Sequence, residues 1–205
     1  MVHGRTGGQS DDAIKIRDAQ RNDQLSRIMG EQLKADPTDA RASFHLALHA
    51  QSLGDFKKAL KLQKQYFKYG IAKGERWYVY FNRGLCHFAL GNYLRALWTC
   101  TDAEKECPAK WEIAKLRGLI YFKMQAYTKA IKYFVDCFDE NTGDVSYKPW
   151  ARDNAGVWNL IGECYFNLNK MDLAKDSFEE AWKLEPKGKL KKFYYDRMAV
   201  IVKML

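Results

Sequence analysis

The sequence lacks a long hydrophobic run. Its uninterrupted apolar stretches are only a few residues long, whereas a membrane-spanning helix needs about 18 or more. The first residues, MVHGRTGGQSDD, contain no apolar core of the kind that a secretory signal requires. The sequence therefore predicts a chain that folds in water, with residues 1–10 as a flexible tail or linker.

Paired cysteines and strand-forming patterns are missing as well. The five cysteines are odd in number, show no C-x-x-C pair and lie inside apolar helical stretches. We interpret them as reduced thiols of the core, which predicts a cytoplasmic location. Because no strand is expected, no glycine-rich phosphate loop can follow one, and the glycines of HGRTGG at residues 3–8 are interpreted as part of the tail.

Catalytic motifs are scarce. His45 and His49 have a spacing that lets two histidines share a metal, but the glutamate of a zinc protease is absent between them and no third ligand is near. Cys86 and His87 are helix neighbours, so their side chains point about 100° apart and cannot pair as nucleophile and base. A group of carboxylates lies at a helix end and in a loop, where solvated charges are common: Asp136, Asp139, Glu140 and Asp144. The sequence predicts no enzyme, no cofactor and no metal site.

Positive charge exceeds negative charge. Lys and Arg total 34 and Asp and Glu total 25, a net charge of +9 that favours nucleic acid, anionic lipid or acidic proteins as partners. The basic residues are spread along the chain, however, with one denser run, KGKLKK, at 187–192. We interpret them mainly as solvated helix faces, and binding to RNA or to a membrane surface remains the less favoured alternative.

The sequence does contain a repeated helical pattern. A small residue and a later alanine recur 12 residues apart at four places, and successive copies begin 37, 34 and 44 residues apart. Spacing is thus constant within a unit and varies between units, as expected for helical hairpins joined by loops of different length. Small residues let the two helices of a hairpin approach closely. The four pairs are Ala47 and Ala59, Gly84 and Ala96, Gly118 and Ala130, and Gly162 and Ala174.

The last unit carries seven residues at linked spacings: Trp158, Ile161, Gly162, Tyr165, Ala174, Phe178 and Pro186. Their spacing resembles the motif of the tetratricopeptide repeat, W-x2-L-G-x2-Y followed by A-x3-F and P, with Ile in place of Leu. The resemblance implies an all-α solenoid of about four hairpins within one superhelical domain at 11–205. The expected elements are a leading helix at about 11–35, hairpins at about 39–69, 75–106, 110–140 and 151–184, and a capping helix at 188–204.

Turn signals separate the two helices of each hairpin. Gly54 and Gly91 mark the first two turns. The third and fourth turns, near Gln125 and Asn169, lack a glycine, so an asparagine or a local turn is expected to end the helix there.

By this resemblance, the first helices of the hairpins line a concave groove that binds a protein segment. Several of their residues, above all the phenylalanines, can instead pack between repeats. One subfamily grips acidic C-terminal tails with basic and asparagine side chains, and at the matching positions here only Asn82 fits, because the others are Phe44, Leu48, Glu112 and Leu116. The main groove candidates are Phe44, Leu48, Tyr78, Phe81, Asn82, Phe88, Lys115, Phe122, Asn159 and Phe166, with Leu85, Glu112, Leu119 and Glu163 beside them.

Residues 15–186 contain RN at 21–22, DPTDAR at 36–41, a link with Gly70 and Gly74, and a widened gap with Trp150 and Asp153. This order of features more narrowly resembles the tetratricopeptide region that follows the catalytic domain of some family 2 glycosyltransferases. It implies an accessory region that positions an acceptor or mediates oligomerisation. The catalytic part is not in this sequence, which has no D-x-D motif, so a non-catalytic scaffold remains the main hypothesis.

The closing stretch, KLKKFYYDRMAVIVKML, carries an apolar stripe at helical spacing: Leu190, Phe193, Tyr194, Met198, Ile201 and Leu205. In its second half Ala199, Val200 and Val202 widen the apolar surface beyond one stripe. We predict that this helix covers the last hairpin and that its excess apolar surface forms a homodimer, with a membrane contact as the alternative.

Overall fold

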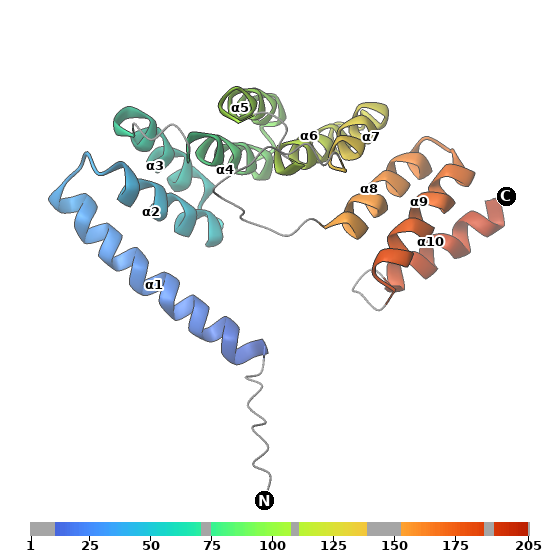
Figure 1. Cartoon of the computed structure of the whole chain (residues 1–205), viewed down its shortest axis with the longest axis horizontal. Coiled ribbons are helices and arrows are strands. Elements are labelled where there is room, and N and C mark those ends of the chain that lie inside the picture. The colour runs from blue at the N-terminus through green and yellow to red at the C-terminus, as the bar shows by residue number, and fades with distance from the viewer. Residues whose placement is uncertain (1–10, 71–74, 108–110, 139–152, 187–190, 205) are drawn as a thin grey trace, which may run out of the picture. The chain divides into compact units, whose positions relative to one another are not determined.

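The structure is a computed structural model that describes residues 11–70, 75–107, 111–138, 153–186 and 191–204. Within these ranges the chain forms ten helices and no strand (Figure 1), so the predicted all-α architecture is confirmed. The expected tail at 1–10, part of the link with Gly70 and Gly74 and most of the gap with Trp150 and Asp153 lie outside the described residues, as do Asp139, Glu140, Asp144, Leu190 and Leu205.

The helices follow one another along the chain with short connections. They are α1 (Asp11–Ala35), α2 (Ala40–Ser52), α3 (Phe56–Tyr69), α4 (Arg76–Ala89), α5 (Tyr93–Glu106), α6 (Trp111–Lys123), α7 (Tyr127–Asp136), α8 (Asn154–Asn167), α9 (Met171–Leu184) and α10 (Lys191–Met204).

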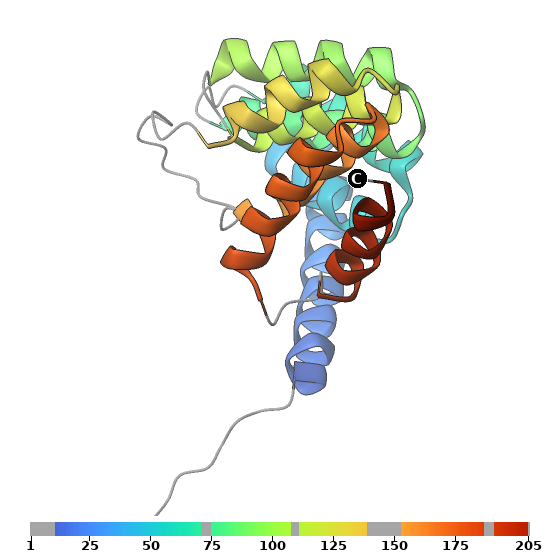
Figure 2. The same cartoon turned by 90° about the vertical axis from the view of Figure 1, so that its right-hand side faces the viewer.

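The chain divides into two compact units, residues 1–71 and 72–205. In the first unit α2 packs on both α1 and α3. In the second unit three hairpins, α4–α5, α6–α7 and α8–α9, follow one another, and α10 packs on α9 (Figures 1 and 2). The expectation of one continuous superhelical domain stays a prediction.

Aspartates begin three of the helices. A carboxylate oxygen of Asp39 accepts a hydrogen bond from the Ala42 N–H at 2.8 Å. Asp55 does the same for Lys58 at 3.0 Å, and Asp153 for Gly156 at 2.8 Å. Each carboxylate satisfies one of the amides that a helix leaves without a partner at its start, which locates the first residue of α2, α3 and α8.

A residue in the left-handed conformation follows the first helix of each hairpin. Gly54 and Gly91 have φ of +78° and +73°, which costs glycine nothing. Asn169 has φ of +58° and Gln125 has +59°. All four turns therefore share one backbone conformation. In the two turns without glycine, this conformation is adopted by residues that populate the left-handed region less readily than glycine does.

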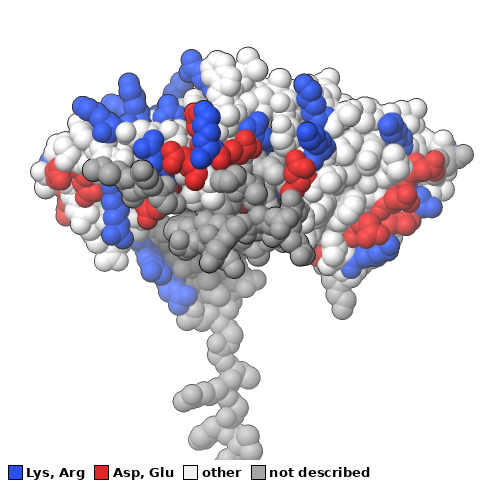
Figure 3. Space-filling view, turned by 45° about the horizontal axis from the view of Figure 1, so that its top comes forward, with Lys and Arg blue, Asp and Glu red and all other residues white. Residues whose placement is uncertain are grey.

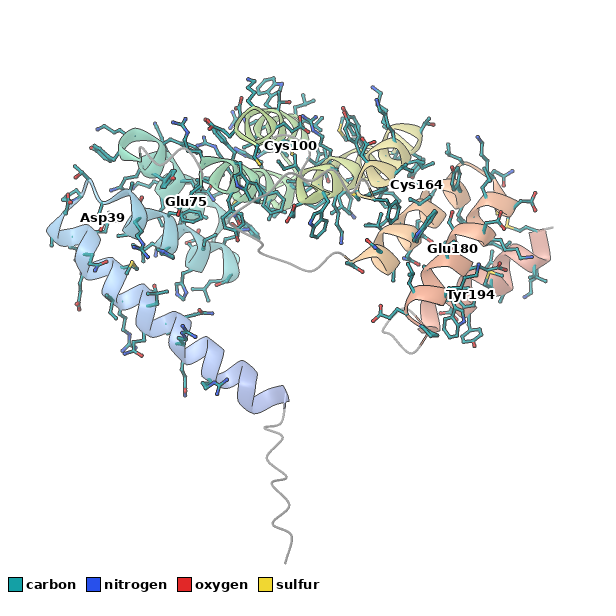
Figure 4. The ribbon with its side chains drawn as sticks, in the orientation of Figure 1. Asp39, Glu75, Cys100, Cys164, Glu180 and Tyr194 are labelled. Atoms are coloured by element: carbon teal, nitrogen blue, oxygen red, sulfur yellow. The ribbon has the colours of Figure 1, made fainter. Side chains whose placement is uncertain are left out.

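The small residues of the repeat lie where paired helices cross. Cys100 of α5 is directed toward α4 (Figure 4), and its sulfur would lie 3.8 Å from a Cβ atom added at Gly84. The alanines of the pattern, Ala47, Ala59, Ala96, Ala130 and Ala174, are fully buried.

Two of the glycines lie directly beneath an aromatic ring. A Cβ atom added at Gly162 would come within 2.6 Å of the Phe178 ring, and one added at Gly118 would overlap the ring of Phe134 in the same way. Both rings are fully buried. In these two hairpins the absence of a side chain on the first helix is therefore what leaves room for the ring of the second.

A buried arginine joins the second hairpin of the chain to the third. Arg117 of α6 donates from Nε and Nη2 to the two carboxylate oxygens of Glu104 at 2.7 and 2.6 Å, and from Nη2 to the Thr101 hydroxyl at 2.8 Å. Burial opposes the charged form, but the contact with Glu104 outweighs it and the pKa of Arg117 is raised. The guanidinium thus stays charged and holds α6 against α5.

We expect Gly118→Ala and Gly162→Ala to destabilise the protein. Overpacking costs about 1–3 kcal/mol and the gain in helix propensity returns about 1 kcal/mol, so a net loss of free energy of unfolding should appear in urea titrations. Gly84→Ala is the matched control, because the nearest contact of its new Cβ is the flexible end of Leu116 at 3.0 Å and its other neighbours lie at 3.8 Å. A loss in Gly84→Ala as large as in Gly118→Ala would contradict the role of the rings.

Candidate functional site

A pocket lies between the first helices of two successive hairpins. Helices α4 and α6 contact each other and leave between them a cavity with a volume of about 160 Å³. The residues that line it are Phe81, Leu85, Trp111, Glu112, Lys115, Leu116 and Leu119.

Helical spacing explains the pocket walls. Phe81 and Leu85 are one turn apart on α4. Along α6, Trp111, Lys115 and Leu119 form one row, with Glu112 and Leu116 in the row beside it. Phe81, Glu112 and Leu116 are buried and form the floor, whereas the other four are half-buried. The pocket therefore offers partly exposed apolar side chains over a buried base.

An ion pair fixes the polar side of the pocket. Lys115 Nζ lies 3.1 Å from Oδ2 of Asp153, the residue that caps α8. Burial alone would raise the pKa of Asp153, but the hydrogen bonds from the Gly156 amide and from Lys115 outweigh it and hold that pKa below its usual range. The Asp153 carboxylate is thus charged at neutral pH. Lys115 also lies 6.0 Å from the centroid of the Trp111 ring.

The structure brings part of the expected groove together here. Phe81 and Lys115 line the pocket, as do Leu85, Glu112 and Leu119. Trp111 was not among the groove candidates. The four-residue steps that link it to Lys115 and Leu119 are the signal that would have found it.

Several other candidates pack inside their own hairpins, whereas the alternative that the sequence left open was packing between repeats. In each case a ring on a first helix meets a tyrosine of the following helix. The ring pairs and centroid distances are Phe44–Tyr66 (5.7 Å), Phe88–Tyr93 (6.0 Å) and Phe122–Tyr127 (5.6 Å).

The candidates Asn82, Phe166 and Glu163 also make contacts within the fold. The side-chain amide of Asn82 donates to the Tyr78 carbonyl at 2.8 Å, and both residues are buried. Asn82, the one residue that fitted a carboxylate clamp, thus bonds to its own helix. The Arg197 guanidinium of α10 lies 4.8 Å from the ring centroid of Phe166, and its Nε is 2.6 Å from Glu163 Oε1.

A second cavity, of about 170 Å³, lies in the first unit between α1 and α2. Leu48 lines it together with His45 and His49, and His49 Nε2 is 3.7 Å from Asp23 Oδ1. Among the described residues no three His, Cys, Asp or Glu side chains come together as metal ligands would. Asn159 is half-buried on α8 and lines neither cavity.

The cysteines are packing residues. All five are free, and Cys107 alone of them is not fully buried. Burial raises the pKa of Cys100 and of Cys164 to about 12. These two thiols are therefore protonated at neutral pH, which makes them poor nucleophiles. No helix in the described ranges has the length and apolar character needed to cross a membrane.

Comparison with known proteins agrees with the repeat pattern. Residues 46–108 and 155–187 match models of the tetratricopeptide repeat. A cow (Bos taurus) protein, BBSome complex member BBS4, is 26% identical over 157 residues, which are 77% of this chain but only 28% of that protein. The chain thus spans under a third of this relative.

Solved structures share the fold. The crystal structure of MamA aligns with 88% of this chain and 98% of its own, with a TM-score of 0.67 and 21% identity. YrrB, described as a TPR protein with an unusual peptide-binding site, aligns with 90% of this chain and 88% of its own, with a TM-score of 0.65 and 14% identity. The chain is therefore similar to tetratricopeptide solenoids in architecture.

We expect stability to fall in mild acid through His87 of α4. Burial, then the charges of Arg83 and Arg95, lower the pKa of His87 below its ordinary 6.5. The folded state thus disfavours the protonated form, so this stability is present above about pH 6.5 and is lost as the pH falls toward the lowered pKa. Thermal melts between about pH 7.5 and 5.5 should show a falling Tm, with a smaller fall in His87→Gln. If the Tm of His87→Gln falls as much as the Tm of the unchanged protein, groups other than His87 cause the loss of stability.

Proposed function

We propose that this chain of tetratricopeptide repeats is a non-catalytic scaffold that binds a segment of another protein across α4 and α6. The observation that carries the proposal is the pocket between these helices, which combines half-buried apolar side chains with a charged lysine at one side. The peptide-binding site named for YrrB supports it as an analogy of fold.

The size of the pocket favours a peptide side chain over a small-molecule substrate. Sites for drug-sized ligands usually measure about 300–1,000 Å³, and this pocket has about 160 Å³. One leucine-sized or phenylalanine-sized side chain of a partner would bury itself against Leu85 and Leu119, which is worth about 1.5–3 kcal/mol. The rest of the partner segment would lie over the flanking helix surface.

Lys115 supplies the polar contact. Its ammonium has three donors, and the contact with Asp153 uses one of them. The remaining donors are placed to bind a backbone carbonyl or a carboxylate of the partner next to the anchoring side chain. The proposed partner is therefore a segment with an apolar anchor and a hydrogen-bond acceptor close to it.

Peptides selected from a random display library against the whole chain test this site. We expect Leu85→Lys to weaken a selected peptide by about 10-fold or more, because a charge replaces apolar contact at the pocket wall. Lys115→Ala should weaken it less, through the polar contact alone.

Leu94→Lys is the matched control for this experiment. Leu94 is 62% exposed on α5 and lies outside the pocket, so the same substitution there should change the dissociation constant by less than about twofold. Circular dichroism and thermal melts should show that all three variants fold. Equal loss in Leu85→Lys and Leu94→Lys, or none in either, would place the peptide elsewhere.

An accessory role beside a family 2 glycosyltransferase stays a prediction of the sequence, because none of the relatives named above is a glycosyltransferase. Under that hypothesis the same pocket would hold an acceptor or a neighbouring domain. The cytoplasmic location inferred from the reduced thiols likewise stays a prediction.

A second candidate function, RNA binding, rests on one face of α3. This helix contains no acidic residue, and its exposed lysines stand in a row: Lys57, Lys61, Lys64 and Lys68, with Lys58 beside them. The row occupies an arc of about 60° and runs for about 16 Å along the helix. Figure 3 shows blue Lys and Arg atoms gathered over this region. A single line of charges matches a nucleic-acid strand better than a flat membrane surface.

Fluorescence anisotropy with a single-stranded RNA of about 20 nucleotides tests this candidate. We expect binding that weakens between about 50 and 200 mM salt, and a loss of about 10-fold or more in Lys61→Glu/Lys64→Glu because two phosphate contacts become repulsive. Lys129→Glu/Lys132→Glu on α7 changes the net charge equally and is the control. An equal loss in the control, or binding to phosphatidylserine vesicles without binding to RNA, would contradict an RNA site on α3.

A further inference from the structure

The outward face of α10 is solvent-exposed and partly apolar. Ile201 of this helix is fully buried in a cluster with Met171, Ala174 and Phe178 of α9. Tyr194, labelled in Figure 4, stacks on Trp182 with ring centroids 4.9 Å apart. These contacts fix which side of α10 faces the hairpin and therefore which side faces away from it.

The exposed face has a defined composition. Successive residues of a helix are about 100° apart, so Asp196, Ala199, Val200 and Lys203 fall within an arc of about 100° roughly opposite Tyr194 and Ile201. All four are exposed. Tyr195, at 53% exposure, and Met204, at 54%, flank them on the two sides. The face is thus apolar in the middle, with an acid toward one end and a base toward the other.

We propose that this face binds the same face of a second copy of the chain, with the two α10 helices antiparallel around a two-fold axis between Ala199 and Val200. In that register Asp196 of each copy meets Lys203 of the other. At the axis Ala199 meets Ala199 of the other copy and Val200 meets Val200 of the other copy. A closed two-fold contact of this kind uses the same patch on both copies.

Charge selects the antiparallel arrangement. A parallel pair in register would place Asp196 against Asp196 and Lys203 against Lys203, and like charges at a contact disfavour it. The antiparallel pair makes two Asp196–Lys203 contacts instead. Within one helix these residues are two turns, or about 10 Å, apart, too far to pair with each other. Because exposed ion pairs contribute only about 0.2–1 kcal/mol each, they set the register more than the strength.

Apolar contact at the axis supplies the attraction. Ala199 has the small side chain that lets two helices approach, and Val200, which is 40% exposed in the single chain, would be covered there. A single pair of short helices buries less than the about 1,200–2,000 Å² of a standard stable interface. We therefore expect a dissociation constant in the micromolar range. The inference is independent of the pocket between α4 and α6, although a dimer would present that pocket twice.

Sedimentation equilibrium of the whole chain between about 1 and 100 µM tests the dimer. The chain should shift from monomer to dimer over this range, and Val200→Lys should weaken association by about 10-fold or more because it buries charge at the axis. A chain that stays monomeric throughout, that grows beyond a dimer, or that dimerises unchanged with Val200→Lys would overturn the proposal.

A charge exchange tests the register. Asp196→Lys and Lys203→Asp should each weaken the dimer by about 10-fold, since each creates two repulsive contacts, and the double variant should restore the affinity to within about threefold. Lys132→Asp, at an exposed site on α7, is the control and should have no effect. If the double variant does not regain the affinity of the unchanged dimer, the antiparallel register is wrong. A parallel pair would keep its like-charge contacts in every one of these variants, so the charge exchange could not restore its affinity. Circular dichroism should show equal helix content throughout.

Discussion

The contact between a bare glycine backbone and an aromatic ring sets the geometry of the last two hairpins. Phe134 lies against Gly118 and Phe178 lies against Gly162, at distances that leave no room for even a methyl group. Close-packed interiors tolerate little change in volume, so each ring fixes how near its two helices lie and how they are rotated. On the same helix as Gly118, residues Trp111, Lys115 and Leu119 line the pocket between α6 and α4, and Trp111 and Leu119 also pack against the core cluster that contains Phe134.

Between hairpins a different interaction prevails. Arg117 is buried and donates to both oxygens of Glu104, so α6 is tied to α5 by a charge pair of fixed geometry. A buried ion pair contributes little net stability, but losing one partner is costly, and the pair specifies one alignment of the two helices. Lys115 and Asp153 make a more exposed contact from α6 to the start of α8. Aromatic packing within hairpins and ion pairs between them thus locate the pocket walls.

The surfaces left over have distinct chemistry. The pocket between α4 and α6 is small and mostly apolar, α3 presents a row of lysines, and the outer face of α10 combines apolar and oppositely charged residues. Each of these surfaces is the basis of one of the proposals above. The buried thiols Cys100 and Cys164, with raised pKa values, have the character of core residues rather than of a reactive centre.

The sequence by itself determined the helical hairpins, because the helix period, the 12-residue step between small residues and the turns at Gly54 and Gly91 are local features. It also located Phe81 and Lys115 on first helices. Only the tertiary structure decided that Gln125 adopts positive φ and that Asn82 bonds to its own helix. The Lys115–Asp153 pair joins residues 38 positions apart across a link of variable length. Such contacts depend on how the hairpins stack. Stacking depends on how side chains from distant parts of the sequence fit together, which a local sequence pattern does not show.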